Sequence, residues 1–300
     1  MREQTSSMLQ RVVAALQRRP LDRIPKGEIT IEDEVVRDAL GCAKVGFEER
    51  LRFTSLLGLD IFCLSPKSPE LSGGLPNARA LHWPDLRSWV DRSGLFVFAV
   101  LDGAFGWGVK LFGFMKFLPL FIHEEETLRD FQRGIESLNS ELARDLAGRG
   151  VHGFILADDV AYQSGLFVGP NAMRRHFLAP LARQAEAMLS LGLPVFFHSD
   201  GNYLDILPEI SAVGFHGLHC IDSESGMDVD AIRSQVGPAL CLWGTLSARE
   251  LERSPVPEAR AETLRKIQSA AADGSFMVGT TSGLFKGLQI EALRALYERI

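Results

Sequence analysis

The chain has 300 residues, of which 46% are hydrophobic and 23% are charged, and its formal net charge at pH 7 is −6. This length suits one large α/β barrel or two ordinary domains, and the composition is typical of a globular protein. The acidic balance argues against nucleic acid as a partner, because nucleic-acid-binding proteins usually carry a basic stripe, and no apolar run is long enough to span a membrane.

The beginning of the chain and its thiols indicate a cytoplasmic protein. Residues 1–4 lead into an amphipathic segment and do not have the pattern of a signal peptide. The four cysteines are scattered, with no CxxC pair, at Cys42, Cys63, Cys220 and Cys241. We therefore expect free thiols in a reducing compartment and no disulfide framework.

The first third of the chain alternates between helix and strand patterns. Leu9, Val12 and Leu16 recur at the spacing of one helical face and predict a helix over residues 7–18. The elements expected after it are a strand over 24–29, a helix over 46–57, a strand over 59–64, a helix over 84–92 and a strand over 95–101.

Residues 103–122 form an unusual insert that is rich in aromatic residues and glycine. Glycine interrupts the insert too often for a membrane span. Trp107, Phe112, Phe114 and Phe117 are typical of packing in a core or a lid. We expect a mostly buried lid or helical excursion over the mouth of a barrel.

From residue 124 onward the alternation is regular. The strands are short and almost entirely apolar, as parallel strands buried on both faces must be. The predicted elements are a helix over 124–148, a strand over 151–157, a helix over 171–191, a strand over 194–198, a helix over 203–212, a strand over 214–220, a helix over 227–235, a strand over 239–243, helices over 247–253 and 258–272, a strand over 275–280 and a helix over 288–299.

These patterns give eight strands when residues 24–29 are counted as the first. They predict an α/β fold with a single (β/α)8 TIM barrel domain over residues 1–300, an N-terminal helix and the apolar insert. A doubly wound open sheet is the alternative, but no GxGxxG motif follows an early strand.

Several predicted strands end in polar residues. The apolar run over 194–197 leads into His-Ser-Asp-Gly-Asn at 198–202, and other strands end at Asp158 and Thr281. The carboxyl ends of barrel strands meet at one face, where catalytic residues lie. We therefore expect catalytic roles for His198, Asp200 and Asp158. Substrate-binding roles are expected for Glu28, Asp159, Tyr162, Gln163, Asn202 and Thr281.

Structural roles are open for the same residues. His198 could hydrogen-bond the barrel rim, and Asp200 could cap the helix that follows. Asp158 and Asp159 are adjacent on a strand and point in opposite directions, so at most one should face the mouth. Cys220 ends a strand and could approach a metal, although a thiol in an apolar run is more often part of a core. His216 and His219 are expected to be buried and hydrogen-bonded.

The chain resembles the uroporphyrinogen decarboxylase superfamily, which includes the decarboxylase of haem biosynthesis and the corrinoid-dependent methyltransferases. The match runs in order over nearly the whole chain. The segments that carry it are residues 20–25 (Pro-Leu-Asp-Arg-Ile-Pro), 157–170, 198–202, 242–246 (Leu-Trp-Gly-Thr-Leu) and 279–284 (Gly-Thr-Thr-Ser-Gly-Leu).

The methyltransferases resembled here hold zinc through a His-x-Cys pair and a distant cysteine. In this chain His198 stands at the histidine position, Asp200 at the first cysteine and Ser282 at the second. The resemblance therefore implies a metal site of His198 with oxygen ligands from Asp200 and, weakly, Ser282. Zinc or another divalent metal with less preference for thiolate would suit such a site.

The resemblance is nearest to the methyltransferase branch. It implies transfer of a methyl group between a small methylated substrate and a corrinoid carried by a partner protein. A decarboxylase of uroporphyrinogen or another acid is an alternative. However, residues 25–29 read Pro-Lys-Gly-Glu-Ile where the decarboxylase has an arginine-rich motif, and residues 62–66 lack its aspartate. A non-catalytic ligand-binding barrel is the other alternative, because both family cysteines are absent. A pocket containing Glu28, Asp158 and Asp200 should prefer cationic or neutral ligands.

Overall fold

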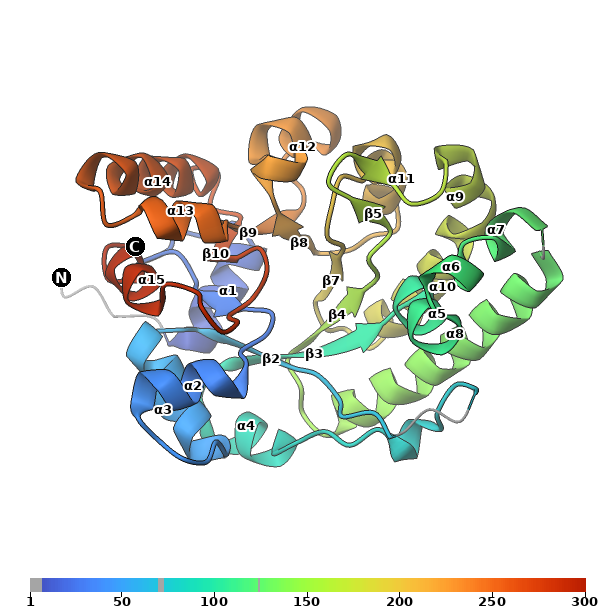
Figure 1. Cartoon of the computed structure of the whole chain (residues 1–300), viewed down its shortest axis with the longest axis horizontal. Helices are drawn as coiled ribbons and strands as arrows, with labels where there is room; N and C mark the ends of the chain where they lie inside the picture. Colours follow the sequence, from blue (N-terminus) through green and yellow to red (C-terminus); the bar gives the residue numbers. More distant parts are fainter. Residues whose placement is uncertain (1–6, 70–72, 124) are drawn as a thin grey trace.

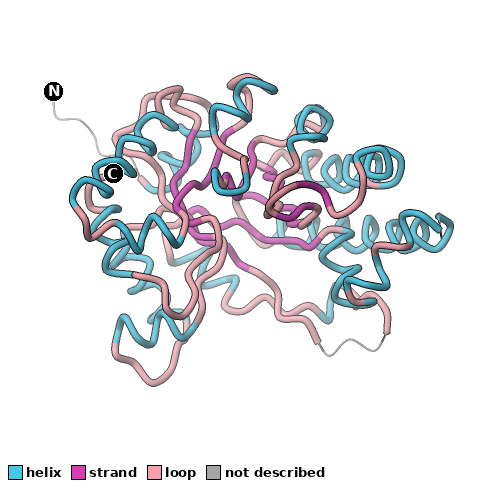
Figure 2. The backbone as a smooth tube through the Cα atoms, turned by 45° about the horizontal axis from the view of Figure 1, so that its top comes forward, coloured by secondary structure: helices cyan, strands magenta, loops and turns pink. Residues whose placement is uncertain are grey.

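The computed structural model describes residues 7–69, 73–123 and 125–300. Its main sheet contains eight strands, every neighbouring pair of which is parallel, and the helices lie outside them (Figures 1 and 2). The strands, in their order around the sheet, are β1 (Gly27–Glu28), β2 (Ile61–Leu64), β3 (Phe96–Asp102), β4 (Gly153–Ala157), β7 (Val195–His198), β8 (Gly217–Ile221), β9 (Cys241–Leu246) and β10 (Phe276–Thr280).

The sheet closes on itself where its first and last strands meet. Lys26, next to β1, forms an isolated parallel bridge with Val278 of β10. The Val278 N–H donates to the carbonyl of Pro25 at 2.9 Å. The predicted eight-stranded TIM barrel is therefore confirmed.

The helices agree with the predicted alternation except in a few places. The helix expected over 171–191 is two helices that meet at Phe177, and α2 was not predicted because only Val35 and Val36 bury an apolar face there. The α-helices are α1 (Met8–Leu16), α2 (Asp33–Leu40), α3 (Phe47–Leu57), α4 (Leu86–Arg92), α5 (Ala104–Phe112), α6 (Phe114–Phe117), α7 (Leu120–His123), α8 (Glu125–Gly148), α9 (Pro170–His176), α10 (Leu178–Leu189), α11 (Leu207–Ala212), α12 (Val229–Val236), α13 (Ala248–Arg253), α14 (Pro257–Ala270) and α15 (Ile290–Tyr297). Short elements add a hairpin of β5 (Ala161–Tyr162) and β6 (Gly165–Leu166) and the 3-10 turns η1 (Ala78–Ala80), η2 (Leu204–Ile206) and η3 (Ser223–Ser225).

The barrel interior is packed with aromatic side chains. Phe98 contacts both Phe196 and Trp243, with ring centroids 5.4 and 5.8 Å away. The Trp243 indole donates to the carbonyl of Gly27 at 3.2 Å. A Cβ at Gly27 would lie 2.7 Å from Trp243, so only glycine allows this approach.

The N-terminal helix closes the amino end of the barrel. Val12 of α1 belongs to the same apolar cluster as the interior residues. Asp60, which precedes β2, is fully buried and accepts hydrogen bonds from Arg11, Arg23 and the backbone N–H of Lys26. These bonds fix the N-terminal segment to the first two strands, away from the carboxyl ends that carry the site.

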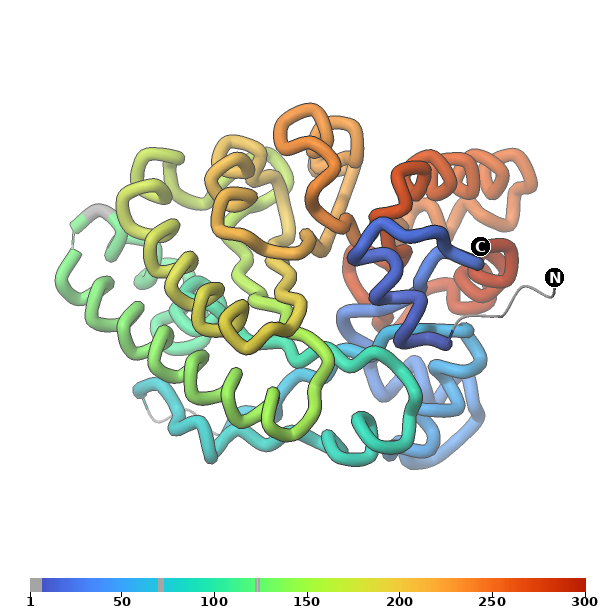
Figure 3. The backbone as a smooth tube through the Cα atoms, turned by 180° about the vertical axis from the view of Figure 1, so that it is seen from behind, coloured from blue at the N-terminus to red at the C-terminus, as the bar shows by residue number. Residues whose placement is uncertain are grey.

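The insert is helical, as predicted, and comprises α5, α6 and α7. Figure 1 shows these helices alongside α8 and α9, and the rear view in Figure 3 shows α8 and α10 packed side by side. Phe105 and Phe117 meet edge to face at 5.4 Å within the insert. Among the described residues, no helix combines the length and apolar character needed to cross a bilayer.

Candidate functional site

His198 and His219 lie side by side at the carboxyl ends of β7 and β8. The two residues are in register, and their Nδ1 atoms are 2.8 Å apart. One Nδ1 must therefore donate and the other accept. His219 is fully buried, and this burial lowers its pKa well below the ordinary value. A neutral His219 holds the imidazole of His198 in place and leaves the Nε2 atom of His198 facing the mouth.

Two carboxylates surround that Nε2 atom. It lies 3.7 Å from an oxygen of Asp159 and 4.0 Å from an oxygen of Asp200. Asp159 is itself held in place, because it accepts a hydrogen bond from the backbone N–H of Asp200 at 2.8 Å. These three residues offer ligand atoms that lie within 4.8 Å of one another.

The spacing of these three donors fits a divalent cation. Distances of 3.7 and 4.0 Å are too long for hydrogen bonds. Two ligands bound to one tetrahedral zinc at about 2.1 Å lie roughly 3.4 Å apart, so small side-chain movements would allow one ion to bind all three. Imidazole nitrogen and carboxylate oxygen are both ordinary ligands for zinc and for harder divalent metals.

A pocket of about 300 Å³ opens beside this cluster. Two aspartates contribute to its surface, and none of the described residues that line it is lysine or arginine. The lining residues are Ala161, Tyr162, Gln163, Asp200, Gly201, Cys220, Asp222, Ser225, Thr281 and Ser282. The pocket is therefore acidic, as expected, although Asp222 takes the place of the predicted Glu28 and Asp158.

Cys220 forms part of the pocket wall at the end of β8. Its thiol donates to the carbonyl of Thr281 at 3.2 Å. Burial, followed by the carboxylates of Asp200, Asp222 and Asp159, raises the pKa of this thiol well above its ordinary value. Without a cation nearby, Cys220 is therefore a neutral thiol.

The β5–β6 hairpin borders the pocket on the side of β4. Tyr162 is half exposed and stacks on Phe167 at 5.8 Å, and Gln163 donates to the carbonyl of Glu224 at 3.4 Å. The hairpin lies against Gly201, where an added Cβ would come within 2.6 Å of its backbone. This close approach holds Tyr162 and Gln163 beside the cluster, where substrate contact was predicted.

Glu28 does not reach this pocket. It alternates with the inward-facing Gly27 and points toward α15, where it accepts hydrogen bonds from Thr280 and from the Tyr297 hydroxyl at 2.6 Å. Burial raises the pKa of Glu28 to about 7, against the effect of those hydrogen bonds. Its contacts are those of a structural residue that ties β1 to β10 and α15.

Asp158 is also directed away from the pocket. Its carboxylate accepts from the backbone N–H groups of Ala104, Phe105 and Gly106 at 2.9, 2.6 and 3.0 Å, in the first turn of α5. Burial raises the pKa of Asp158 to about 8, while the three hydrogen bonds favour its ionised form. Asp158 therefore anchors the insert, and Asp159 is the member of the pair that faces the mouth.

The remaining predicted residues divide between the pocket wall and its support. Thr281 and Ser282 line the pocket, and the Ser282 hydroxyl donates to the carbonyl of Gly283 at 3.4 Å. The side chain of Asn202 accepts a hydrogen bond from the backbone N–H of Leu204, the first residue of η2, at 3.1 Å. The N-cap residue of η2 is Tyr203, so the capping role considered above for Asp200 is not observed.

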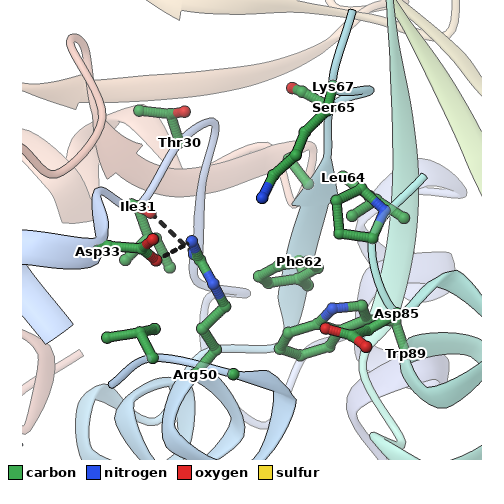
Figure 4. Close-up of a pocket in the computed structure, with 14 residues that line it drawn as sticks. Thr30, Ile31, Asp33, Arg50, Phe62, Leu64, Ser65, Lys67, Asp85 and Trp89 are labelled. Carbon is green, nitrogen blue, oxygen red and sulfur yellow. Dashed lines mark hydrogen bonds and ion pairs between the residues drawn. The ribbon is translucent and has the colours of Figure 1, made fainter. Parts of the chain in front are cut away.

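A second cavity, of about 200 Å³, lies near the carboxyl ends of β1 and β2. Figure 4 shows the side chains of Arg50 and Lys67 extending into it above Phe62. Arg50 pairs with Asp33 and donates to the carbonyl of Ile31 at 2.9 Å. Lys67 has no ion-pair partner within the described ranges, and Asp85 also lines the cavity, so this cavity contains cationic side chains that the first pocket lacks.

The neighbourhood of His198, His219 and Cys220 was not predicted from the sequence. His219 was expected to be buried and Cys220 to be part of a core or close to a metal, and both residues are buried. The signal that connects them to His198 is strand register, since His198 pairs with His219 across β7 and β8. Aligning the two predicted strands by their polar ends would have found the pair.

Comparisons with known proteins agree with this architecture. The family model for uroporphyrinogen decarboxylase (URO-D) matches residues 95–300. No curated protein matches the chain.

Two solved structures illustrate the similarity of fold. A methyltransferase from Methanosarcina mazei superposes with a TM-score of 0.74 at 16% identity and covers 98% of each chain. A sugar phosphate isomerase/epimerase from Parabacteroides distasonis gives a TM-score of 0.53 at 12% identity, over 91% of this chain and 97% of that one. At such low identities the likeness concerns the fold alone.

Proposed function

The chain belongs to the uroporphyrinogen decarboxylase family, and from that premise we propose that it is an enzyme that transfers a methyl group between a small methylated substrate and a corrinoid carried by a partner protein. The observation that supports this proposal best is the cluster of Asp159, His198 and Asp200 beside an acidic pocket. The similarity in fold to a methyltransferase agrees with it.

The residues of the cluster would hold a divalent cation. Such a cation would lower the pKa of a bound thiol or hydroxyl and so favour a nucleophile at neutral pH. Binding through the Nε2 atom of His198 places the remaining imidazole proton on Nδ1, where His219 accepts it. Tyr162 and Gln163 would orient the substrate, because methyl transfer requires donor and acceptor in line.

An exposed apolar surface beside the pocket suits a corrinoid-carrying partner. Tyr162 stacks on Phe167, and Phe167 meets Phe114 edge to face at 4.8 Å. Met115, next to Phe114, is 82% exposed. Exposed apolar residues that continue from a pocket onto the rim are typical of interaction sites.

The test is methyl transfer to reduced free cobalamin, followed by its change in absorbance, with a panel of methylated thiols and amines. We expect turnover by the wild-type protein and at least about a hundredfold loss in His198→Ala, because both metal and substrate positioning depend on that side chain. His82→Ala, which changes an exposed histidine that belongs to neither the cluster nor the pocket lining, should retain full activity. Turnover that survives in His198→Ala would reject the proposed centre.

Decarboxylation of an organic acid is the second candidate, and the cavity with Arg50 and Lys67 is the observation that favours it. Cations of this kind could hold a substrate carboxylate. Uroporphyrinogen and smaller acids should therefore be assayed in parallel. Release of carbon dioxide without any methyl transfer would select the decarboxylase. Binding without either reaction would select a non-catalytic barrel.

A further inference from the structure

The cavity near the carboxyl ends of β1 and β2 combines an apolar floor with charged walls. Phe62 and Trp89 belong to its lining, and their buried rings stack with centroids 3.5 Å apart. The volume of about 200 Å³ equals that of roughly seven water molecules at about 30 Å³ each. The cavity therefore has room for a ligand of the size of a small amino acid.

Arg50 supplies a fixed cation on one side of this cavity. Its guanidinium donates to the carbonyl of Ile31 at 2.9 Å and pairs with the carboxylate of Asp33. These contacts hold the guanidinium in one orientation and leave further N–H donors, because arginine has five of them. A guanidinium held in this way can donate to the acid group of a ligand.

Two opposite charges line the same cavity and are not paired with each other. In the described part of the chain, neither the ammonium group of Lys67 nor the carboxylate of Asp85 has a hydrogen-bond or ion-pair partner. Figure 4 shows Lys67 and Arg50 reaching toward the same space above the ring of Phe62. Asp85 lies below that ring in the same view. A ligand that carries both an acid group and an ammonium group would complement both charges.

Asp85 also has a strained backbone at this cavity. Its φ is +52°, in the left-handed region, and it stands at the N-cap of α4 without making a capping hydrogen bond through its side chain. Aspartate tolerates this region better than most L residues, but only glycine adopts it without strain. Because the carboxylate neither caps the helix nor pairs with a cation, local structure does not explain it. Strained residues of this kind are typical of ligand sites.

We infer that this cavity binds a small zwitterion, with its acid group on Lys67 and Arg50 and its ammonium group on Asp85. The aliphatic part of the ligand would lie against Phe62 and Trp89. A ligand with two acid groups would bring one of them to Asp85, so one charge of each sign suits the cavity best. This inference goes beyond the proposed function, because it requires neither a metal nor methyl transfer.

Calorimetry of the full-length protein with a series of ω-amino acids tests this inference. The series runs from glycine to 6-aminohexanoate, and each member is compared with the alkylamine and the alkanoate of matching chain length. We expect at least one amino acid to bind about tenfold more tightly than both of its single-charge analogues, because both charges then find a partner. Equal affinity for the amino acid and either analogue throughout the series would overturn the inference.

Single substitutions assign each charge of the ligand to its partner. Lys67→Gln should weaken binding of the amino acid about tenfold and leave the affinity for the alkylamine unchanged. Asp85→Asn should weaken binding of the amino acid to a similar extent and leave the affinity for the alkanoate unchanged. Lys116→Gln and Asp91→Asn are the controls, since they make the same changes of charge at exposed residues that do not line the cavity. A control that loses as much affinity as its matched variant would refute the assignment.

Asp85→Gly separates ligand binding from folding. Because glycine accepts a φ of +52° without strain, this variant should unfold at the same temperature as the ligand-free wild-type protein or higher. A saturating concentration of the amino acid should raise the unfolding temperature of the wild-type protein and not that of the variant. Equal stabilisation of both proteins by the amino acid would exclude Asp85 as its partner.

The outcomes also separate this inference from the proposed reaction. A protein that binds the amino acid and transfers no methyl group retains the zwitterion site and loses the proposed reaction. A protein that transfers methyl groups and binds no member of the series retains the proposed reaction and loses the zwitterion site.

Discussion

At the scale of single residues, one position along a strand decides between a structural and a chemical role. Gly27 faces the barrel interior and Glu28, the next residue, faces α15. Likewise Asp158 turns to α5 while Asp159 faces the pocket side of the rim. The sequence indicates that the side chains of two such neighbours point in opposite directions. Which of the two faces the mouth depends on strand register, and short strands do not determine the register.

Glu28 should make stability depend on pH. Its pKa is about 7 in the folded protein against an ordinary value near 4.5, so the folded state holds a proton that the unfolded state releases between these values. The free energy of unfolding should therefore fall as pH rises through that window, by roughly 3 kcal/mol in total. Glu28→Gln keeps a neutral side chain at this site and should remove that dependence.

Urea unfolding of both proteins at pH 5 and pH 8 measures this effect. As pH rises, the unfolding free energy of Glu28→Gln should increase relative to that of the wild-type protein. Parallel pH profiles for the two proteins would mean that the carboxyl group is already ionised at pH 5. Glu141→Gln on the exposed side of α8 provides a control with the same change of charge.

At the scale of elements, the pocket depends on the contact between the β5–β6 hairpin and the loop after β7. Gly201→Ala should disrupt it, because the new Cβ would lie 2.6 Å from the hairpin backbone at a φ of +77°. Gly192→Ala provides a control at a φ of +73°, where nothing lies within 4 Å of the new atom. We expect about 1 kcal/mol of destabilisation in the control and about 2 kcal/mol more in Gly201→Ala.

Chemical denaturation measures both variants, and ligand titration separates stability from the site. Gly201→Ala should also weaken binding in the pocket, since the hairpin carries Tyr162 and Gln163. Equal losses of stability in the two variants would show that the hairpin moves away at no cost. The contact would then have no role in shaping the pocket.

The insert depends on a different contact, between Asp158 and the first turn of α5. Asp158→Ala should leave three backbone N–H groups without an acceptor and destabilise the protein by about 3 kcal/mol. Asp158→Asn keeps one acceptor oxygen, so its free energy of unfolding should fall by roughly half as much. Hydrogen exchange should accelerate in α5 before it accelerates in α10. Uniform acceleration in both helices would contradict a local anchoring role.

At the scale of the whole molecule, regular parts of the barrel were predictable and irregular parts were not. The strand expected over 194–198 is observed as β7, because buried parallel strands are continuous apolar runs. Cys220 lies where β8 departs from regular pairing, and no sequence pattern marks that irregularity. The hairpin of β5 and β6 is similarly short and follows from contacts with Gly201 more than from local propensity.

The charge of the molecule also bears on its substrate. The chain has a net charge of −6, and Asp159, Asp200 and Asp222 lie together at or beside the pocket. In the metal-free protein a polyanion would meet unscreened repulsion there, whereas a methylated ammonium ion would be attracted. At low ionic strength we therefore expect tetramethylammonium to bind at least about tenfold more tightly than citrate.

Calorimetry at two salt concentrations tests whether this preference is electrostatic. Added salt should reduce the difference in affinity between tetramethylammonium and citrate, because the screening length falls from about 10 Å at 0.1 M to about 3 Å at 1 M. Asp200→Asn should narrow it as well, while Glu141→Gln makes the same change of net charge far from the pocket and should leave it unchanged. If Glu141→Gln reduces the difference in affinity between tetramethylammonium and citrate as much as Asp200→Asn does, the preference arises from the total charge of the protein and not from the pocket. Tight binding and turnover of uroporphyrinogen would contradict the prediction. A polycarboxylate would then bind cationic side chains such as Arg50 and Lys67, which line the cavity on the other side of the barrel mouth.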